Sequence, residues 1–198
     1  MTTKRRDRTQ RRGDERKALI ARAALAVIER HGVSGLTHRR VATEAGVSLG
    51  TTTYHFATLD DILESAFGVA MSEDMDGLTQ WFESLPAGCD LPEELTQLVL
   101  RKTSQEKGNV YVNFELVLAA AQRPSLHVKA HAWATFLARL FERYVSDEAA
   151  EAVAVVYDGT LLRQTITGSI GGADEIATSF RRACGEEDRL TVQATSGR

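Results

Sequence analysis

The chain has 198 residues, of which 43% are hydrophobic and 26% charged, with a formal net charge of −3 at pH 7. These values are those of an ordinary globular protein of one or two domains. No apolar run approaches the ~20 residues of a membrane helix, the basic N-terminus lacks the apolar stretch of a secretory signal, and Cys89 and Cys184 are too few for a disulfide framework or a metal cluster. We therefore expect a cytoplasmic protein without a cofactor.

The charge is unevenly distributed along the chain. Residues 1–60 hold 12 Lys and Arg against 6 Asp and Glu, a balance of +6, whereas residues 61–198 hold 12 against 21, a balance of −9. A basic head on an acidic body is typical of a nucleic-acid-binding module joined to a domain with another role.

Residues 1–13, MTTKRRDRTQRRG, are basic and almost without apolar side chains. We expect either a flexible arm that reaches DNA or a solvated tail. A first helix is predicted from Asp14 to His31, with an apolar stripe that gives the following helices something to pack on. The stripe consists of Leu19, Ile20, Ala23, Ala24, Val27 and Ile28.

Residues 36–63, LTHRRVATEAGVSLGTTTYHFATLDDIL, predict two short helices separated by a tight turn and followed by a third helix. Thr37, Ser48 and Thr58 are suited to cap the three helix starts. Gly46 permits the positive φ with which a chain leaves a helix sharply. A DNA-reading helix-turn-helix typically has a small residue in its first helix, a glycine and a valine in its turn, and a capped polar second helix. The same order is present in this segment.

The rest of the chain is predicted to be helical as well. A long helix begins at Thr58 and ends before the loop 86–92, and further helical patterns cover 92–107, 109–123, 125–145, 147–168 and 174–184. We therefore predict an all-α fold with an N-terminal three-helix helix-turn-helix DNA-binding head joined to a C-terminal helical-bundle ligand and dimerisation domain. The predicted parts are a flexible basic arm (1–13), the head (14–58), the effector-binding and dimerisation domain (59–185) and a tail (186–198).

The head resembles the DNA-binding domain of the tetracycline-repressor (TetR) family of bacterial transcription regulators. That family carries a motif close to L-T-x-R-x-V-A-x-x-A-G-V-S-x-G-T-x-Y-x-H-F. The matching residues here are Leu36, Thr37, Arg39, Val41, Ala42, Ala45, Gly46, Val47, Ser48, Gly50, Thr51, His55 and Phe56. The chain departs from the pattern at Thr53, where the family usually has Tyr, and at Leu59, where it often has Lys.

The resemblance implies which residues contact DNA. They are Leu49, Gly50, Thr51, Thr53, Tyr54 and His55 on the second motif helix, with Thr37, His38 and Arg39 at the start of the preceding helix. Arg39 is the first choice for a base or phosphate contact because its charged, planar guanidinium group can donate two parallel hydrogen bonds. Arg40 is the alternative. Helical spacing turns Thr52 and Phe56 inward. Tyr54 and His55 have the alternative role of bracing the next helix.

Family members pair as dimers through their last two helices, which implies a homodimer on a palindromic operator in double-stranded DNA. Candidates for the dimer interface are Val153, Val156, Leu161, Leu162, Ile166, Ile176 and Phe180. The alternative is that these residues complete the core of one protomer.

The middle helices are rich in aromatic residues that either line a pocket for an apolar or aromatic small-molecule effector or form core. Ligand-binding candidates are Tyr111, Phe114, Glu115, Trp133, Phe136 and Tyr157, with Arg163 as a further polar candidate. His127 and His131 have a metal-compatible spacing, but no third ligand is evident and no metal is predicted.

We therefore predict a ligand-responsive, sequence-specific transcriptional regulator that is not an enzyme. Most members of the family are repressors, and a repressor is expected here. An effector in the body would move the helix that begins near Leu59 and release the DNA. The alternatives are an activator of the same family, a helical enzyme, and an architectural DNA binder without an effector. The chain contains no GxxxxGK[ST] or HExxH motif that favours the enzyme.

Overall fold

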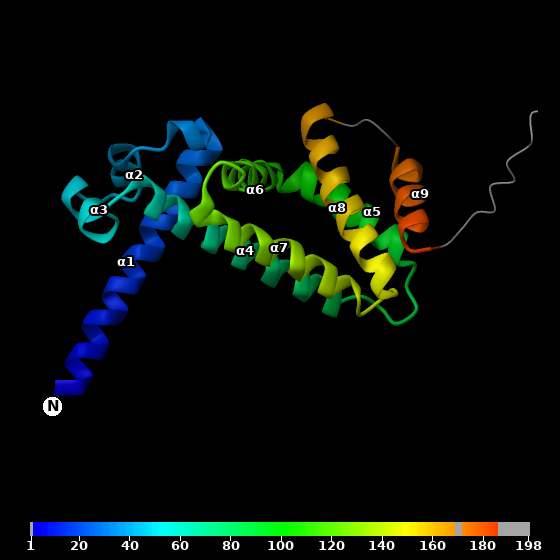
Figure 1. The fold of residues 1–198 in the computed structure, drawn as a ribbon, viewed down its shortest axis with the longest axis horizontal. Helices are drawn as coiled ribbons and strands as arrows, with labels where there is room; N and C mark the ends of the chain where they lie inside the picture. Colours follow the sequence, from blue (N-terminus) through cyan, green and yellow to red (C-terminus); the bar gives the residue numbers. More distant parts are fainter. Residues whose placement is uncertain (1, 169–171, 186–198) are drawn as a thin grey trace, which may run out of the picture. The chain divides into compact units, whose positions relative to one another are not determined.

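The computed structural model describes residues 2–168 and 172–185, and these contain α-helices, one 3-10 turn and no strand, which confirms the all-α class (Figure 1). The elements are α1 (Thr2–His31), η1 (Val33–Gly35), α2 (His38–Glu44), α3 (Leu49–His55), α4 (Leu59–Glu83), α5 (Leu91–Gln105), α6 (Lys107–Ala120), α7 (Pro124–Phe141), α8 (Asp147–Thr167) and α9 (Ala173–Ala183). The predicted tail at 186–198 lies outside the described residues. No helix in the described ranges is long and apolar enough to cross a bilayer.

The chain forms two compact units, and each is interrupted in sequence. The first consists of Met1–Leu85 and Glu106–Thr135, and the second of Pro86–Gln105 and Phe136–Arg198. The first unit thus holds α1–α4, α6 and the beginning of α7, and the second holds α5, the end of α7, α8 and α9. The compact units do not divide at residue 58, because α4 and α6 pack against α1.

The apolar stripe of α1 forms the centre of the first unit. Ile20, Ala24 and Ile28 are completely buried, while Leu19 is 41% exposed and lies outside the stripe to which the sequence assigned it. The stripe packs against α4 and α2, and α2 packs against α3. The buried partners on the short helices and α4 are Val41, Ala42, Ile62, Leu63, Ala66, Phe67, Ala70 and Met71. An ion pair between Arg22 and Glu73, at 2.8 Å, joins α1 to α4 on the surface.

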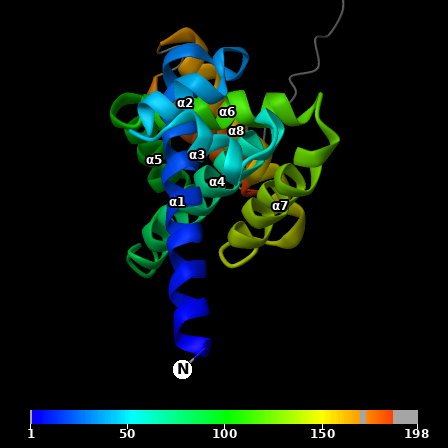
Figure 2. The ribbon, with the colours of Figure 1, turned by 90° about the vertical axis from the view of Figure 1, so that its left-hand side faces the viewer.

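Helix α1 begins at Thr2, so the prediction of a flexible arm over residues 1–13 is wrong for the described part of that segment. Figures 1 and 2 both show the first turns of α1 extending beyond α2 and α3. The physical reason is that Arg, Lys and Gln are good helix formers, so a basic segment extends an existing helix without burying any surface. Arg11, Arg12, Arg16 and Lys17 are exposed on this extension.

The predicted N-caps are present at all three helix starts of the head. The side chains of Thr37, Ser48 and Thr58 accept hydrogen bonds from the amides of Arg40, Thr51 and Asp61, at 3.2, 3.0 and 3.0 Å. At α4 the cap is reciprocal, because the Asp61 carboxylate accepts a bond of 2.8 Å from the Thr58 amide. These bonds fix the chain direction at each corner of the head.

In the second unit, α5, α8 and α9 pack around one core. Its buried side chains include Leu95, Leu98, Val99, Val153, Tyr157, Leu161, Ile176 and Phe180. The rings of Phe141 and Tyr157 meet edge to face, with centroids 6.1 Å apart. Ser146 caps α8 through the Ala149 amide at 3.3 Å, and Gly168 ends that helix with a φ of 67°.

The Asp61 cap predicts a pH dependence of stability. The bond from the Thr58 amide, followed by that with the Thr58 hydroxyl, holds the pKa of Asp61 below its ordinary value. The charged Asp61 carboxylate therefore stabilises the folded protein fully above the pKa of an unfolded aspartate, about 3.9. This contribution is lost as the pH falls through the lowered pKa of Asp61 in the folded state. Asp61→Asn should be less stable than the wild type at pH 7, and the difference should close below about pH 4.

The measurement is the free energy of unfolding in urea at several pH values. Asp76→Asn is the matched control, since Asp76 is exposed on the same helix. Equal pH dependence of the two variants would contradict the prediction.

Candidate nucleic-acid interface

The turn between α2 and α3 has the geometry that the sequence predicts. Gly46 adopts a φ of 63°, and a Cβ added there would meet nothing within 4 Å, so the backbone conformation rather than space requires glycine. The Val47 amide donates to the Ala42 carbonyl at 3.0 Å, which draws the chain back over the end of α2. The two helices are thereby held as a compact corner beside α1 (Figure 2).

Helix α3 has one buried face and one open face. Thr52 and Phe56 are 0% and 6% exposed, as the helical spacing predicts. On the opposite face, Tyr54 is 85% and Leu49 is 45% exposed. Gly50 and Thr53 are exposed with them, while Thr51 and His55 are half-buried at the edges. The open face therefore carries the residues that the sequence assigned to a reading surface.

The hydroxyl groups of α3 are partly used within the helix. The Thr53 hydroxyl donates to the carbonyls of Leu49 and Gly50, both at 3.2 Å, and the hydroxyls of Ser48 and Thr51 lie 2.9 Å apart. Tyr54 meets His55 edge to face at 5.1 Å between ring centroids. The open face thus presents mainly methyl groups and one projecting phenol, which suits contact with thymine methyl groups and phosphates.

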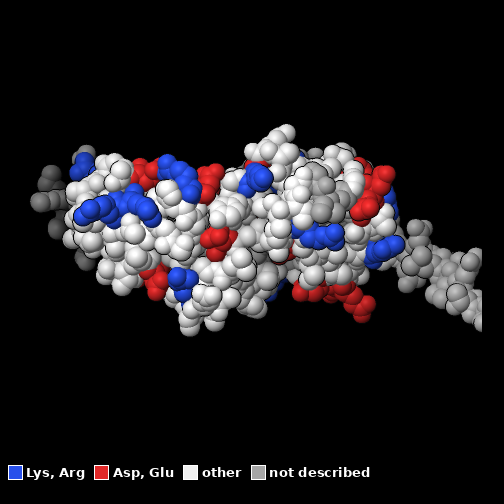
Figure 3. Space-filling view, turned by 90° about the horizontal axis from the view of Figure 1, so that it is seen from above, with Lys and Arg blue, Asp and Glu red and all other residues white. Residues whose placement is uncertain are grey.

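The two arginines of α2 have different surroundings. The Arg40 guanidinium donates to the Gly35 carbonyl at 2.6 Å and so holds η1 against α2. The Arg39 side chain is exposed and has no hydrogen-bond or ion-pair partner among the described residues. Arg39 is therefore the cation of α2 that is free to bind an anion. Figure 3 shows Lys and Arg atoms exposed on this face of the molecule and interspersed with Asp and Glu atoms.

Thr37 and His38 complete the predicted set at the start of α2. Thr37 is exposed and already caps the helix, whereas His38 is half-buried. The Nδ1 atom of His38 is buried without a hydrogen-bond partner in the described chain, and the charge of His38 contributes to the lowered pKa of Asp61. Of the two, the geometry leaves Thr37 more accessible to a ligand.

Glu115 joins α6 to the head through contacts that no pattern in the sequence marks. One carboxylate oxygen of Glu115 accepts a hydrogen bond of 2.9 Å from the Val33 amide of η1, and the other accepts one of 3.0 Å from the Tyr111 hydroxyl. The second bond raises the pKa of Tyr111. After α6, Arg123 donates to Asp60 of α4 at 3.2 Å. Helix α6 and the turn after it thus contact the elements on either side of the helix-turn-helix, η1 and α4.

The remaining effector candidates are distributed over the two units. Phe114 is half-buried and Trp133 is 8% exposed in the first unit, while Phe136 is half-buried and Tyr157 fully buried in the second. Arg163, His127 and His131 are exposed. Within the described ranges, no group of three His, Cys, Asp or Glu side chains is placed to hold a metal.

Burial also separates the candidates for the dimer interface. Val153, Leu161, Ile176 and Phe180 are at most 6% exposed within one protomer, so they complete its core and are not available to a partner. Val156 is half-buried, and Ile166, at 73%, is exposed. Leu162, a further candidate, is 37% exposed. Val155, which was not among the candidates, is 64% exposed on the same helix.

A capped helix-turn-helix with an open second helix and a free arginine defines the class of DNA-binding regulators. Comparison with known proteins identifies the family. Residues 20–66 match the model of the bacterial regulatory proteins of the tetR family, and residues 90–186 match that of the tetracyclin repressor-like C-terminal domain. The chain belongs to the TetR family and is a transcriptional regulator, not an enzyme.

Similar solved structures extend over most of the chain. A member of the TetR family (SCO1917) from Streptomyces coelicolor A3 is 33% identical, with 86% of this chain and 98% of that chain covered and a TM-score of 0.73. The multidrug binding protein EbrR complexed with ethidium is also 33% identical, with coverages of 85% and 98% and a TM-score of 0.75.

A curated relative matches over the head alone. The HTH-type transcriptional regulator PksA of Bacillus subtilis is 35% identical over 63 residues, which are 32% of this chain and 31% of PksA. The match thus spans about a third of the length of that relative.

The free guanidinium of Arg39 predicts a selective effect on DNA binding. Arg39→Ala should lower the affinity for the DNA that the wild type selects from a random pool by about tenfold, because a charged contact is lost. Fluorescence anisotropy at several salt concentrations should also give a slope of log affinity against log salt that is smaller by about 1 if the contact is to phosphate.

Arg139→Ala is the control, because Arg139 is an exposed arginine of the second unit. Unchanged affinity of the Arg39 variant, together with a loss in Arg40→Ala, would assign the contact to Arg40 instead.

Proposed function

We propose that this regulator is a cytoplasmic repressor that binds a palindromic operator as a homodimer and releases it when a small molecule binds the C-terminal domain. The observation that carries the proposal is the similarity to EbrR, a multidrug binding protein solved with ethidium, proflavin, malachite green and imidazole at 32–33% identity. Because this similarity extends over both the head and the body, the two functions are expected to be coupled in this chain as well.

The proposed DNA contacts lie on the open face of the head. They are Leu49, Gly50, Thr51, Thr53, Tyr54 and His55 of α3, and Thr37, His38, Arg39 and Arg40 of α2. The exposure of Leu49 and Tyr54 and the free Arg39 support this assignment. Because α3 carries no Asn, Gln or Arg, phosphate attraction supplies much of the affinity, and binding depends steeply on salt.

The proposed effector is an aromatic cation. Three of the compounds with which EbrR was solved, ethidium, proflavin and malachite green, are cations with extended aromatic rings. Residues 61–198 of this chain carry a balance of −9 and hold the aromatic candidates Tyr111, Phe114, Trp133, Phe136 and Tyr157. Aromatic rings and negative charge are the groups that stabilise a bound aromatic cation.

The proposed signal passes through α6. Glu115 bonds to the Val33 amide before α2, and Arg123 bonds to Asp60 at the start of α4. A displacement of α6 therefore changes contacts on both sides of the helix-turn-helix. Glu115, a candidate for effector contact in the sequence, is assigned here the role of joining the effector domain to the head.

The test measures two things: binding of an aromatic cation to the protein without DNA, and the loss of operator affinity that such a cation causes. Ethidium should bind the protein alone with a change in its fluorescence. Tetraphenylphosphonium, an aryl cation that does not intercalate, should lower the operator affinity of the wild type at least tenfold. Glu115→Ala should bind the cation as the wild type does but need more of it for release, because the bond to the Val33 amide is lost.

Glu115→Gln, which keeps an acceptor oxygen, is the matched control. Binding of aryl cations without any change in operator affinity would refute the repressor mechanism. Absence of binding would refute the proposed effector class.

The proposed dimer forms through the exposed side of α8. Ala152, Val155, Gly159, Leu162 and Ile166 recur at steps of three and four residues and are all exposed. This spacing places them in one stripe along the helix, and its small residues permit close approach of a second helix. A second copy of the chain is the expected occupant, because a single head covers too little DNA for high specificity.

Introducing charge into this stripe should separate the protomers. Val155→Glu combined with Ile166→Glu should convert the dimer to a monomer in sedimentation velocity and lower the operator affinity more than tenfold. Val128→Glu is the control, since Val128 is 79% exposed on α7. A variant that remains dimeric would place the interface elsewhere.

A further inference from the structure

The only two cysteines of the chain line the same hollow, although they are far apart in sequence. The hollow, about 530 Å³, lies in the second unit. Its walls include Gly88, Cys89 and Asp90 of the loop before α5, Tyr144 and Val145 after α7, and Cys184 at the end of α9. Neither cysteine is in a disulfide, and both are half-buried, so solvent reaches them.

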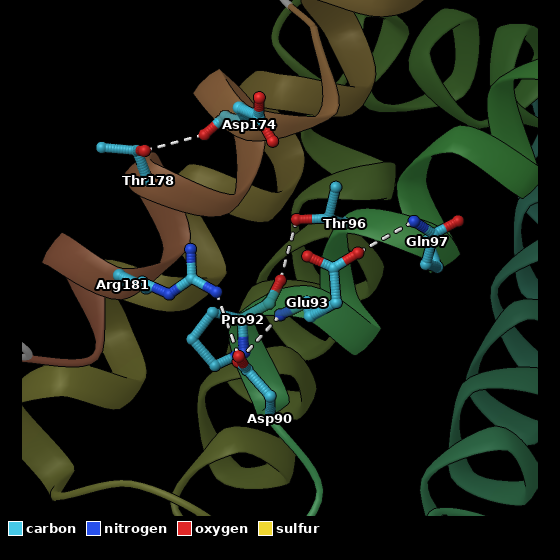
Figure 4. A network of polar contacts seen from close by, with 8 residues as sticks. All are labelled: Asp90, Pro92, Glu93, Thr96, Gln97, Asp174, Thr178 and Arg181. Atoms are coloured by element: carbon cyan, nitrogen blue, oxygen red, sulfur yellow. Dashed lines mark hydrogen bonds and ion pairs between the residues drawn. The ribbon is translucent and has the colours of Figure 1, made fainter.

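An ion pair holds the two cysteine-bearing segments together. The Arg181 guanidinium donates to the Asp90 carboxylate at 3.0 Å, as Figure 4 shows. Asp90 directly follows Cys89, and Arg181 lies one helical turn before Cys184. The bond from Arg181, followed by that from the Glu93 amide, holds the pKa of Asp90 below its ordinary value, so the carboxylate stays charged at neutral pH.

The backbone also fixes both cysteines in place. The Cys89 amide donates to the Pro86 carbonyl at 3.3 Å, in a turn where Gly88 has a φ of 76°. The Cys184 amide donates to the Phe180 carbonyl at 2.8 Å as the C-cap of α9. Both cysteines therefore belong to walls of the hollow whose backbone is hydrogen-bonded.

We propose that Cys89 and Cys184 form a reversible dithiol–disulfide pair that is oxidised by hydrogen peroxide. One thiol, as its thiolate, attacks a peroxide oxygen, releases hydroxide and becomes a sulfenic acid. The second thiol attacks the sulfenic sulfur, the S–O bond breaks, and water leaves with the thiol proton. Overall, two thiols and one peroxide give one disulfide and two waters. The disulfide closes the loop before α5 onto the end of α9.

The experiment uses the reduced full-length protein, free of added thiols. After treatment with hydrogen peroxide, the wild type should lose two titratable thiols per chain and yield a peptide pair joined at residues 89 and 184. The thermal midpoint should rise by about 5 °C, because the cross-link restricts the unfolded chain, and dithiothreitol should reverse the rise.

Cys89→Ser and Cys184→Ser keep the side-chain shape and supply the controls. Each should yield a sulfenic acid that dimedone traps, with no joined peptide and no rise in the thermal midpoint. Asp90→Asn, which weakens the ion pair but keeps both thiols, should slow formation of the disulfide several-fold. Thiols that stay unmodified, that form sulfinic acids, or that join two chains would each overturn the proposal.

Discussion

A helix of seven residues has no independent stability in water, and both α2 and α3 have this length. The surface of the head therefore depends on the apolar stripe of α1, against which α2 and α4 pack. Ile20, Ala24 and Ile28 are completely buried by this packing. Without this packing, α2 and α3 would not stay folded, and the caps at Thr37 and Ser48 alone would not hold them. The burial of one stripe thus stabilises the whole DNA-binding unit.

The features that the sequence predicted correctly are those decided by neighbouring residues. Thr37, Ser48 and Thr58 each bond to an amide three residues along, and Gly46 satisfies a backbone requirement at its own position. The inward face of α3 follows from helical spacing alone. Family patterns record the same local constraints, which is why the match over the head was close.

The features that were missed depend on contacts between distant residues. Glu115 bonds to an amide 82 residues away, and no local pattern marks that partner. Helix α8 is apolar on more than one side, so periodicity did not separate core residues such as Val153 from exposed ones such as Val155. Cys184 lines the same hollow as Cys89 because α9 packs on α5. The composition of the basic N-terminal segment predicted a flexible arm, whereas α1 begins at Thr2. The reason is that adding residues to an existing helix costs little free energy.

The place of α6 has a consequence for protein engineering. The two family models divide the chain into an N-terminal part that ends at residue 66 and a C-terminal part that begins at residue 90. Helix α6 belongs by sequence to the second part, yet it packs with α1 and α4 and satisfies the Val33 amide. A chimera that takes its head from one regulator and its body from another would be cut at the family boundary and would lose these matched contacts. Chimeras of this protein need α6 and the turn at Arg123 from the same parent as the head.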